Sequence, residues 1–249
     1  MKDAADTRKL TYIYLAATLL AITLTTQLGS LFNIIPIVLL GVISPLLLAI
    51  AFSFYEGRWA AVKSFLGHPQ GFQFNVLAFC LALFLPFALM IFSIALDTGK
   101  WVLPAFSIMP GKLPILLILM TGEEYGWRRY AFARLSSHYS FMMSALLVSV
   151  IWLFWHYPGH LVGMGTPDEL SFGLFALMLV PASLLIAYLY HWTKNVYLVI
   201  LAHVSSNMAF NTLPFLPEIT GNNTAFLIYS GLLWLLALPL LLNKKLWCR

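Results

Sequence analysis

The chain has 249 residues, of which 61% are hydrophobic and 9% are charged, and its mean hydropathy is +0.87. Soluble domains carry about 25% charged residues, and a soluble fold of this size cannot hide so much apolar surface. The composition therefore excludes soluble and disordered proteins and predicts an integral membrane protein. A nucleic-acid partner is not expected, because the basic residues behind the net charge of +5 lie between apolar runs.

Apolar runs long enough to cross a bilayer follow one another along the chain. A hydrocarbon core of about 30 Å needs roughly 20 residues of helix. This criterion predicts spans over residues 10–29, 34–54, 74–96, 114–132, 140–156, 170–191, 195–211 and 224–242. The fifth span is short, and we expect His160, beyond Pro158, to lie in a loop. We predict an all-α fold, a single domain over residues 1–249 with about eight transmembrane helices around a polar cavity within the membrane.

Basic residues are distributed unevenly between the two sides that eight spans define. One side, which includes both termini, has 12 of them and the other has two, Lys100 and Lys112. By the positive-inside rule both termini are cytoplasmic, and compact loops favour a bacterial plasma membrane. The 12 residues are Lys2, Arg8, Lys9, Arg58, Lys63, Arg128, Arg129, Arg134, Lys194, Lys244, Lys245 and Arg249.

Two adjacent acids, Glu123 and Glu124, interrupt the apolar pattern of the fourth span, and Arg128 follows them. Six Leu and Ile residues before Glu123 favour insertion by about 2–4 kcal/mol, whereas three central charges oppose it by roughly 8–10 kcal/mol. This polar face must therefore point into the bundle or into a water-filled cavity. Glu124 and Arg128 are four residues apart in the order that favours an ion pair. These three residues could form a purely structural salt-bridge cluster. Two carboxylates share one guanidinium, however, and the acid that remains unpaired favours a catalytic role.

Three further polar side chains come from two other spans. His156 ends the fifth, and His203 and Asn207 lie four residues apart on one face of the seventh. Each alone is explained as a core or interfacial residue. At 1.5 Å per residue, Glu123 and His203 both lie roughly 13–17 Å below the outer hydrocarbon edge, and Asn207 near 10 Å. We therefore expect one cluster that combines a base or acid, a second imidazole and an amide with the two acids.

These motifs, Glu123-Glu124-x-x-x-Arg128, an aromatic-x-x-x-His ending at His156, and His203-x-x-x-Asn207, resemble those of the CPBP family. The family comprises the CAAX prenyl proteases and the related bacteriocin-processing and immunity-associated (Abi) membrane proteases. The resemblance covers residues 75–240, with motif order, span placement and helix count in agreement. One departure is Trp152, which stands where the second motif usually has Phe.

The resemblance implies an intramembrane endopeptidase. Glu123 and His156 would activate a water molecule, His203 and Asn207 would hold the oxyanion, and Glu124 and Arg128 would be a supporting pair; an exchange of roles between Glu123 and Glu124 is open. An imidazole N–H and an Asn amide can donate hydrogen bonds to the negative charge that develops on the carbonyl oxygen during peptide hydrolysis. No cofactor is expected. A divalent metal such as zinc would be bound by Glu123, His156 and His203, but an Asn at position 207 is a poor zinc ligand.

The expected partners are the lipid bilayer and a membrane-anchored or lipidated peptide, either a prenylated CAAX peptide or a bacteriocin or leader peptide. Two other functions use the same residues. A non-catalytic immunity or scaffold protein would keep the fold and bind without cutting. A proton-coupled transporter would use the acids and histidines as a relay, but it predicts inverted repeats, and the sequence has none that we detect.

Overall fold

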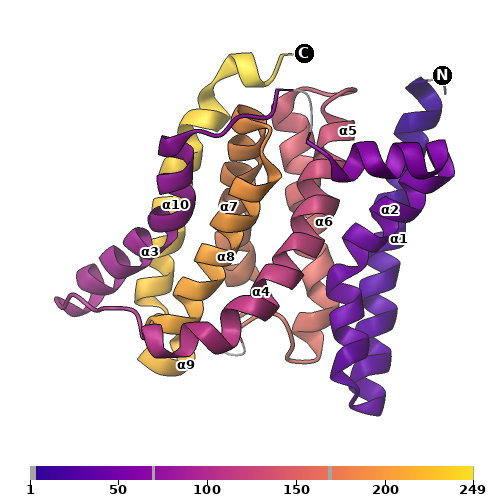
Figure 1. Ribbon diagram of the computed structural model, residues 1–249. Helices are drawn as coiled ribbons and strands as arrows, with labels where there is room; N and C mark the ends of the chain where they lie inside the picture. The colour runs from indigo at the N-terminus through magenta and orange to yellow at the C-terminus, as the bar shows by residue number, and fades with distance from the viewer. Residues whose placement is uncertain (1–3, 69–70, 168–169, 249) are drawn as a thin grey trace.

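The computed structural model describes residues 4–68, 71–167 and 170–248, and within these ranges the chain forms helices and no strands (Figure 1). The longer helices are α1 (Ala4–Phe32), α2 (Ile35–Leu66), α3 (Val76–Thr98), α4 (Met109–Glu124), α6 (Phe141–Leu161), α7 (Phe172–Thr193), α8 (Val196–Thr212) and α10 (Thr224–Leu242). The shorter elements are η1 (Phe106–Ile108), the π-helical η2 (Tyr125–Phe132), α5 (Ala133–Leu135), α9 (Pro217–Thr220) and η3 (Lys244–Leu246).

Eight helical segments of the described chain are long and apolar enough to cross a membrane. This confirms the predicted all-α, eight-span fold of an integral membrane protein. The fourth segment is longer than expected, Phe106–Leu135 instead of 114–132, because η1, α4, η2 and α5 follow one another without a break. α4, α6 and α8 all contact η2, and α6 and α8 both contact α7, so the three predicted motifs lie on helices that share neighbours.

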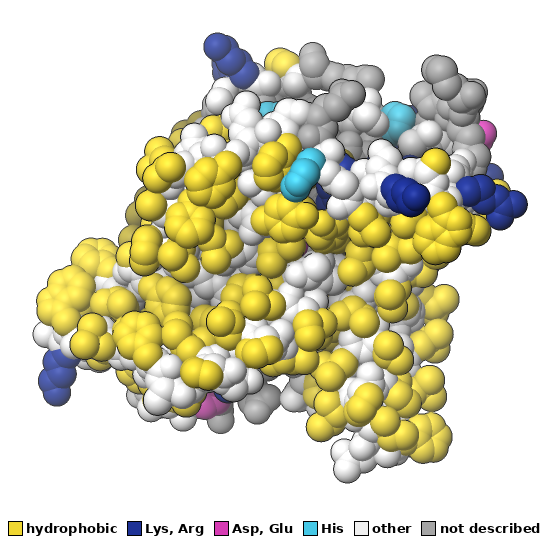
Figure 2. Space-filling model, in the orientation of Figure 1, with side chains coloured by type: hydrophobic (Ala, Val, Ile, Leu, Met, Phe, Trp, Pro, Cys, Tyr) yellow, Lys and Arg dark blue, Asp and Glu magenta, His cyan; other side chains and the backbone are white. Residues whose placement is uncertain are grey.

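The two ends of the chain lie at the same end of the bundle, where α1 begins and α10 ends (Figure 1). On the face drawn in Figure 2, Lys and Arg side chains gather at this end above a broad hydrophobic band. Lys2 and Arg249, which the positive-inside count includes, lie outside the described residues. Counting Arg128 as a loop charge was wrong, because η2 continues the helix and buries this side chain completely. Without Arg128, the side that includes the termini still has many more basic residues than the other.

α2 extends well past residue 54, where the second span was expected to end. Gly57 and Arg58 leave the helical conformation, and Arg58 has a positive φ of 56°, so the backbone kinks there. The segment after the kink runs across the bundle at the end that carries the termini (Figure 1). It buries Val62 and Phe65 while Trp59 stays exposed. A tryptophan at that level is typical of a membrane interface.

α6 also continues beyond its predicted end at residue 156. Pro158 lies inside the helix, which ends at Leu161, so the expectation that His160 is a loop residue was wrong. His160 Nδ1 lies 3.1 Å from Thr166 Oγ1. A proline near the last turn removes a single helical hydrogen bond, and packed neighbours tolerate that loss in a membrane bundle.

Polar caps define where several helices begin. The side chains at these positions accept a hydrogen bond from a backbone N–H of the first turn, which would otherwise have no partner within the helix. At the other end of α3, Gly99 adopts a left-handed conformation with φ of 71°. The capping residues of α3, α6, α7 and α8 are Asn75, Ser140, Ser171 and Asn195.

Candidate active site

The two adjacent acids lie where α4 passes into the π-helical segment η2. π-helical turns are rare and occur frequently at functional sites. Two glycines bring this region close to α2: a Cβ on Gly122 would lie 2.9 Å from Ile43 Cα, and one on Gly126 would overlap Pro45. Small residues at this spacing let helix backbones approach one another in membranes. The contact with α2 therefore fixes the position of the acids within the bundle.

Glu124 is bonded to two basic side chains. Its Oε1 accepts from Arg128 Nη1 at 3.0 Å and lies 2.7 Å from His203 Nδ1 on α8. The side chains of Glu124 and Arg128 are fully buried, so the pair predicted from the spacing of four exists in the interior of the bundle. Arg128 Nη2 also donates to Ser183 Oγ on α7 at 3.1 Å. This network joins α4, η2, α7 and α8.

Glu123 has a different kind of partner. Its Oε2 accepts a hydrogen bond of 2.9 Å from the indole Nε1 of Trp152 on α6. The residue is 3% exposed, and among the described residues this is its one hydrogen bond. The adjacent acids are therefore distinct: Glu124 faces two basic groups, whereas Glu123 faces a neutral donor.

Aromatic rings surround His156 on α6. The centroids of Trp155 and Phe175 lie 5.1 Å from its ring, and that of Trp152 lies 5.5 Å away. In the described part of the chain its Nε2 has no hydrogen-bond partner although it is buried. A buried polar nitrogen without a partner is unusual and is typical of a position that a ligand or water completes.

Asn207 lies one turn beyond His203 on α8. Its Nδ2 donates to the backbone oxygen of His203 at 3.2 Å and contacts Met120 Sδ at 3.4 Å. Methionine sulfur is a weak acceptor, so one of the two amide hydrogens is only weakly engaged. Asn207 is partly exposed, whereas His203 is buried.

Trp152 is the side chain around which Glu123, His156 and His203 meet. Its ring lies 5.4 Å from that of His203 and 5.5 Å from that of His156, while its N–H bonds to Glu123. The hydrogen bond of Trp152 was not predicted from the sequence, although Trp152 lies four residues before His156 and so shares one face of α6 with it. Ser183 was not predicted either, because the sequence has no signal for it.

Glu123, His156 and His203 are the residues that would hold a divalent metal. His203 Nδ1 is bonded to Glu124 and Glu123 Oε2 is bonded to Trp152, so each has one further side-chain donor atom outside these bonds. Across residues 4–68, 71–167 and 170–248, no three His, Cys, Asp or Glu side chains are grouped so that they could hold a metal ion.

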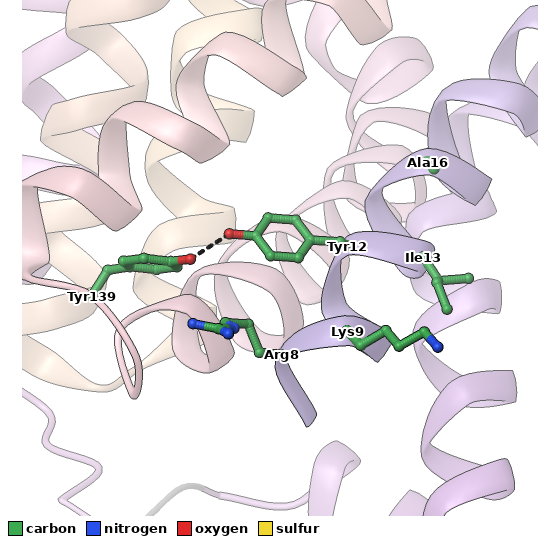
Figure 3. Close-up of a pocket in the computed structure, with 6 residues that line it drawn as sticks. All are labelled: Arg8, Lys9, Tyr12, Ile13, Ala16 and Tyr139. Carbon is green, nitrogen blue, oxygen red and sulfur yellow. Dashed lines mark hydrogen bonds between the residues drawn. The ribbon is translucent and has the colours of Figure 1, made fainter. Parts of the chain in front are cut away.

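A separate hollow of about 510 Å³ lies beside the first turns of α1. Figure 3 shows the hydroxyl groups of Tyr12 and Tyr139 facing each other across it, 2.6 Å apart, with the guanidinium of Arg8 close by and Lys9 directed away. None of the predicted site residues lines this hollow. It belongs to the end of the bundle that carries the termini.

The fold and the site define a class: a polytopic helical membrane protein with ionisable side chains from three helices gathered inside the bundle. Comparison with known families is consistent with this class. Residues 101–209 match the family described as type II CAAX prenyl endopeptidase Rce1-like, which confirms the resemblance over the part of the chain that carries the motifs.

A curated relative agrees with the family match. CAAX prenyl protease 2 from Methanococcus maripaludis is 31% identical to this chain over 150 residues, which cover 56% of this chain and 53% of the relative. The chain thus spans about half the length of the curated relative it matches.

Proposed function

We propose that this protein is an intramembrane endopeptidase that hydrolyses a peptide bond near the C-terminus of a prenylated, membrane-anchored CAAX-type substrate. The observation that carries the proposal is the convergence of Glu123, His156 and His203, from three helices, on Trp152 inside the bundle. The name of the curated relative supports the choice of a CAAX substrate, and the apolar surroundings suit a lipidated chain.

The partners of the two acids favour Glu123 as the general base. Glu124 Oε1 is bonded to both Arg128 and His203, and these bonds assign this carboxylate to the support of the helices, although its Oε2 has no hydrogen-bond partner among the described residues. Glu123 has one neutral donor at Oε2, so Oε1 is available to a water molecule. Glu123, assisted by His156, removes a proton from this water, and the resulting hydroxide attacks the scissile carbonyl carbon.

His203 and Asn207 are the donors for the tetrahedral intermediate. His203 Nδ1 lies 2.7 Å from Glu124 Oε1, so the ring nitrogen that remains for the oxyanion is Nε2, which donates there when it carries a proton. Asn207 Nδ2 exchanges its weak contact with Met120 for the oxyanion. The C–N bond breaks when the proton held by Glu123 passes to the leaving nitrogen.

The test is hydrolysis of a farnesylated, fluorescence-quenched CAAX peptide by the purified protein in nanodiscs. Replacing Glu123 by Gln should reduce kcat by about 10²–10⁴-fold, because it removes the base. His203→Ala should reduce it by about 10²–10³-fold through loss of an oxyanion donor, and His156→Ala should also lose turnover. Glu218→Gln, an exposed acid on α9, is the control that should keep it. Full activity of all three site variants would refute the assignment.

A further inference from the structure

The direction of the hydrogen bond between Trp152 and Glu123 follows from the indole group. An indole Nε1–H can donate but cannot accept, so Glu123 Oε2, 2.9 Å away, must be the acceptor. Trp152 is 3% exposed, and water therefore competes little for this bond. A phenylalanine at the same position would supply the ring contacts but no donor.

The indole ring is held from several sides. The guanidinium carbon of Arg128 lies 4.4 Å from the ring centroid, a cation–π contact. Arg128 is itself bonded to Glu124 and Ser183, and the ring of His203 meets the indole edge-on, 86° from parallel. Because each neighbour is fixed by another element, the donor has little freedom to follow a moving carboxylate.

From this geometry we propose that Trp152 is a positioning residue for hydrolysis. It holds Oε2 of Glu123 and so directs Oε1 toward the attacking water; the inference rests on the proposed function. A carboxylate with one hydrogen bond to a neutral donor keeps the capacity to take a proton, and its rotation about the last side-chain bond is restricted. Precise orientation of this kind comes from the groups that support a catalytic side chain.

The kinetic test replaces the indole N–H and leaves the ring in place. Benzothienylalanine at position 152 has sulfur instead of the N–H and nearly the same shape, so it preserves packing where Trp152→Phe leaves a gap. With the farnesylated CAAX peptide, both variants should lower kcat by about 10- to 100-fold, as expected for a hydrogen bond to a charged group. KM should stay within about twofold, because substrate binding does not use this bond.

Benzothienylalanine at position 127 is the matched control. Trp127 is completely buried, and within the described residues its Nε1 has no hydrogen-bond partner. Its ring packs on Trp155 with centroids 5.9 Å apart. Removing this N–H should leave kcat unchanged. A benzothienylalanine variant at position 152 that folds and keeps wild-type kcat would overturn the inference, and so would one that changes only KM.

An NMR readout tests the hydrogen bond without any activity. In protein labelled with ¹⁵N at the indole nitrogens, the resonance lost in Trp152→Phe identifies the Trp152 N–H. A charged acceptor shifts this proton downfield, so Glu123→Gln should move it upfield and leave the Trp127 signal in place. An unmoved Trp152 signal refutes the inference whatever the kinetics show. A moved signal in a protein that does not cleave the peptide refutes the proposed function and the positioning role, but not the bond.

Discussion

The buried pair of Glu124 and Arg128 makes a quantitative prediction about stability. Arg128 has three contacts in the interior: Glu124 at 3.0 Å, Ser183 at 3.1 Å and the face of Trp152 at 4.4 Å. Replacing Arg128 by Gln removes the charge and leaves Glu124 buried, with His203 as its remaining basic partner. Loss of one member of a buried pair costs about 3–5 kcal/mol. Loss of a single interhelical hydrogen bond, as in Ser183→Ala, costs only about 0.6 kcal/mol in a membrane protein.

The assay is equilibrium unfolding in mixed micelles, with increasing mole fraction of a denaturing detergent and far-UV circular dichroism as the signal. Arg128→Gln should lower the free energy of unfolding by about 3–5 kcal/mol. The double variant Glu124→Gln/Arg128→Gln should be more stable than the sum of the single effects, by about 0.5–3 kcal/mol, because it buries no unpaired charge. Additive effects, or an Arg128→Gln variant as stable as the wild type, would refute the argument that this pair supports the site.

Two further predictions concern the scaffold and the chemistry. Gly126→Ala should destabilise the fold by about 1–3 kcal/mol in the same assay, because the added Cβ overlaps Pro45, whereas Gly231→Ala, which meets no heavy atom within 4 Å, should not. Excess chelator should leave hydrolysis of the farnesylated CAAX peptide unchanged, because in the proposed mechanism Glu123 and His156 activate the water directly; loss of turnover that zinc restores would contradict this.

The transmembrane helices could be predicted because their signal is compositional. Runs of about 20 apolar residues are typical of membrane-spanning helices, and the eight segments of the described chain correspond to the eight predicted. The helix boundaries depend on tertiary contacts, and there the sequence was less informative. Pro158 suggested an end that the packed α6 does not have, and the kink at Gly57 and Arg58 divides a helix where a loop was expected.

The sequence identified the ionisable residues inside the bundle but not the contacts between them. Ionisable residues within spans stand out because placing a charge in the membrane costs free energy. Helical spacing then pairs Glu124 with Arg128 and His203 with Asn207. The contact of Trp152 with Glu123 joins α4 and α6, so it depends on the relative rotation of two helices, and no spacing within either helix determines it. The bond from Arg128 to Ser183 on α7 is of the same kind.

The same limitation explains why the two acids could not be told apart by sequence. Glu123 and Glu124 are neighbours with identical side chains, about 100° apart around the helix, so each faces a different neighbouring helix. The face of Glu124 meets α8 and the guanidinium of Arg128, while the face of Glu123 meets α6. Their different roles in the proposed reaction thus follow from a displacement of one residue along the helix. Glu124 is bonded to two basic groups, whereas Glu123 accepts one hydrogen bond that orients it.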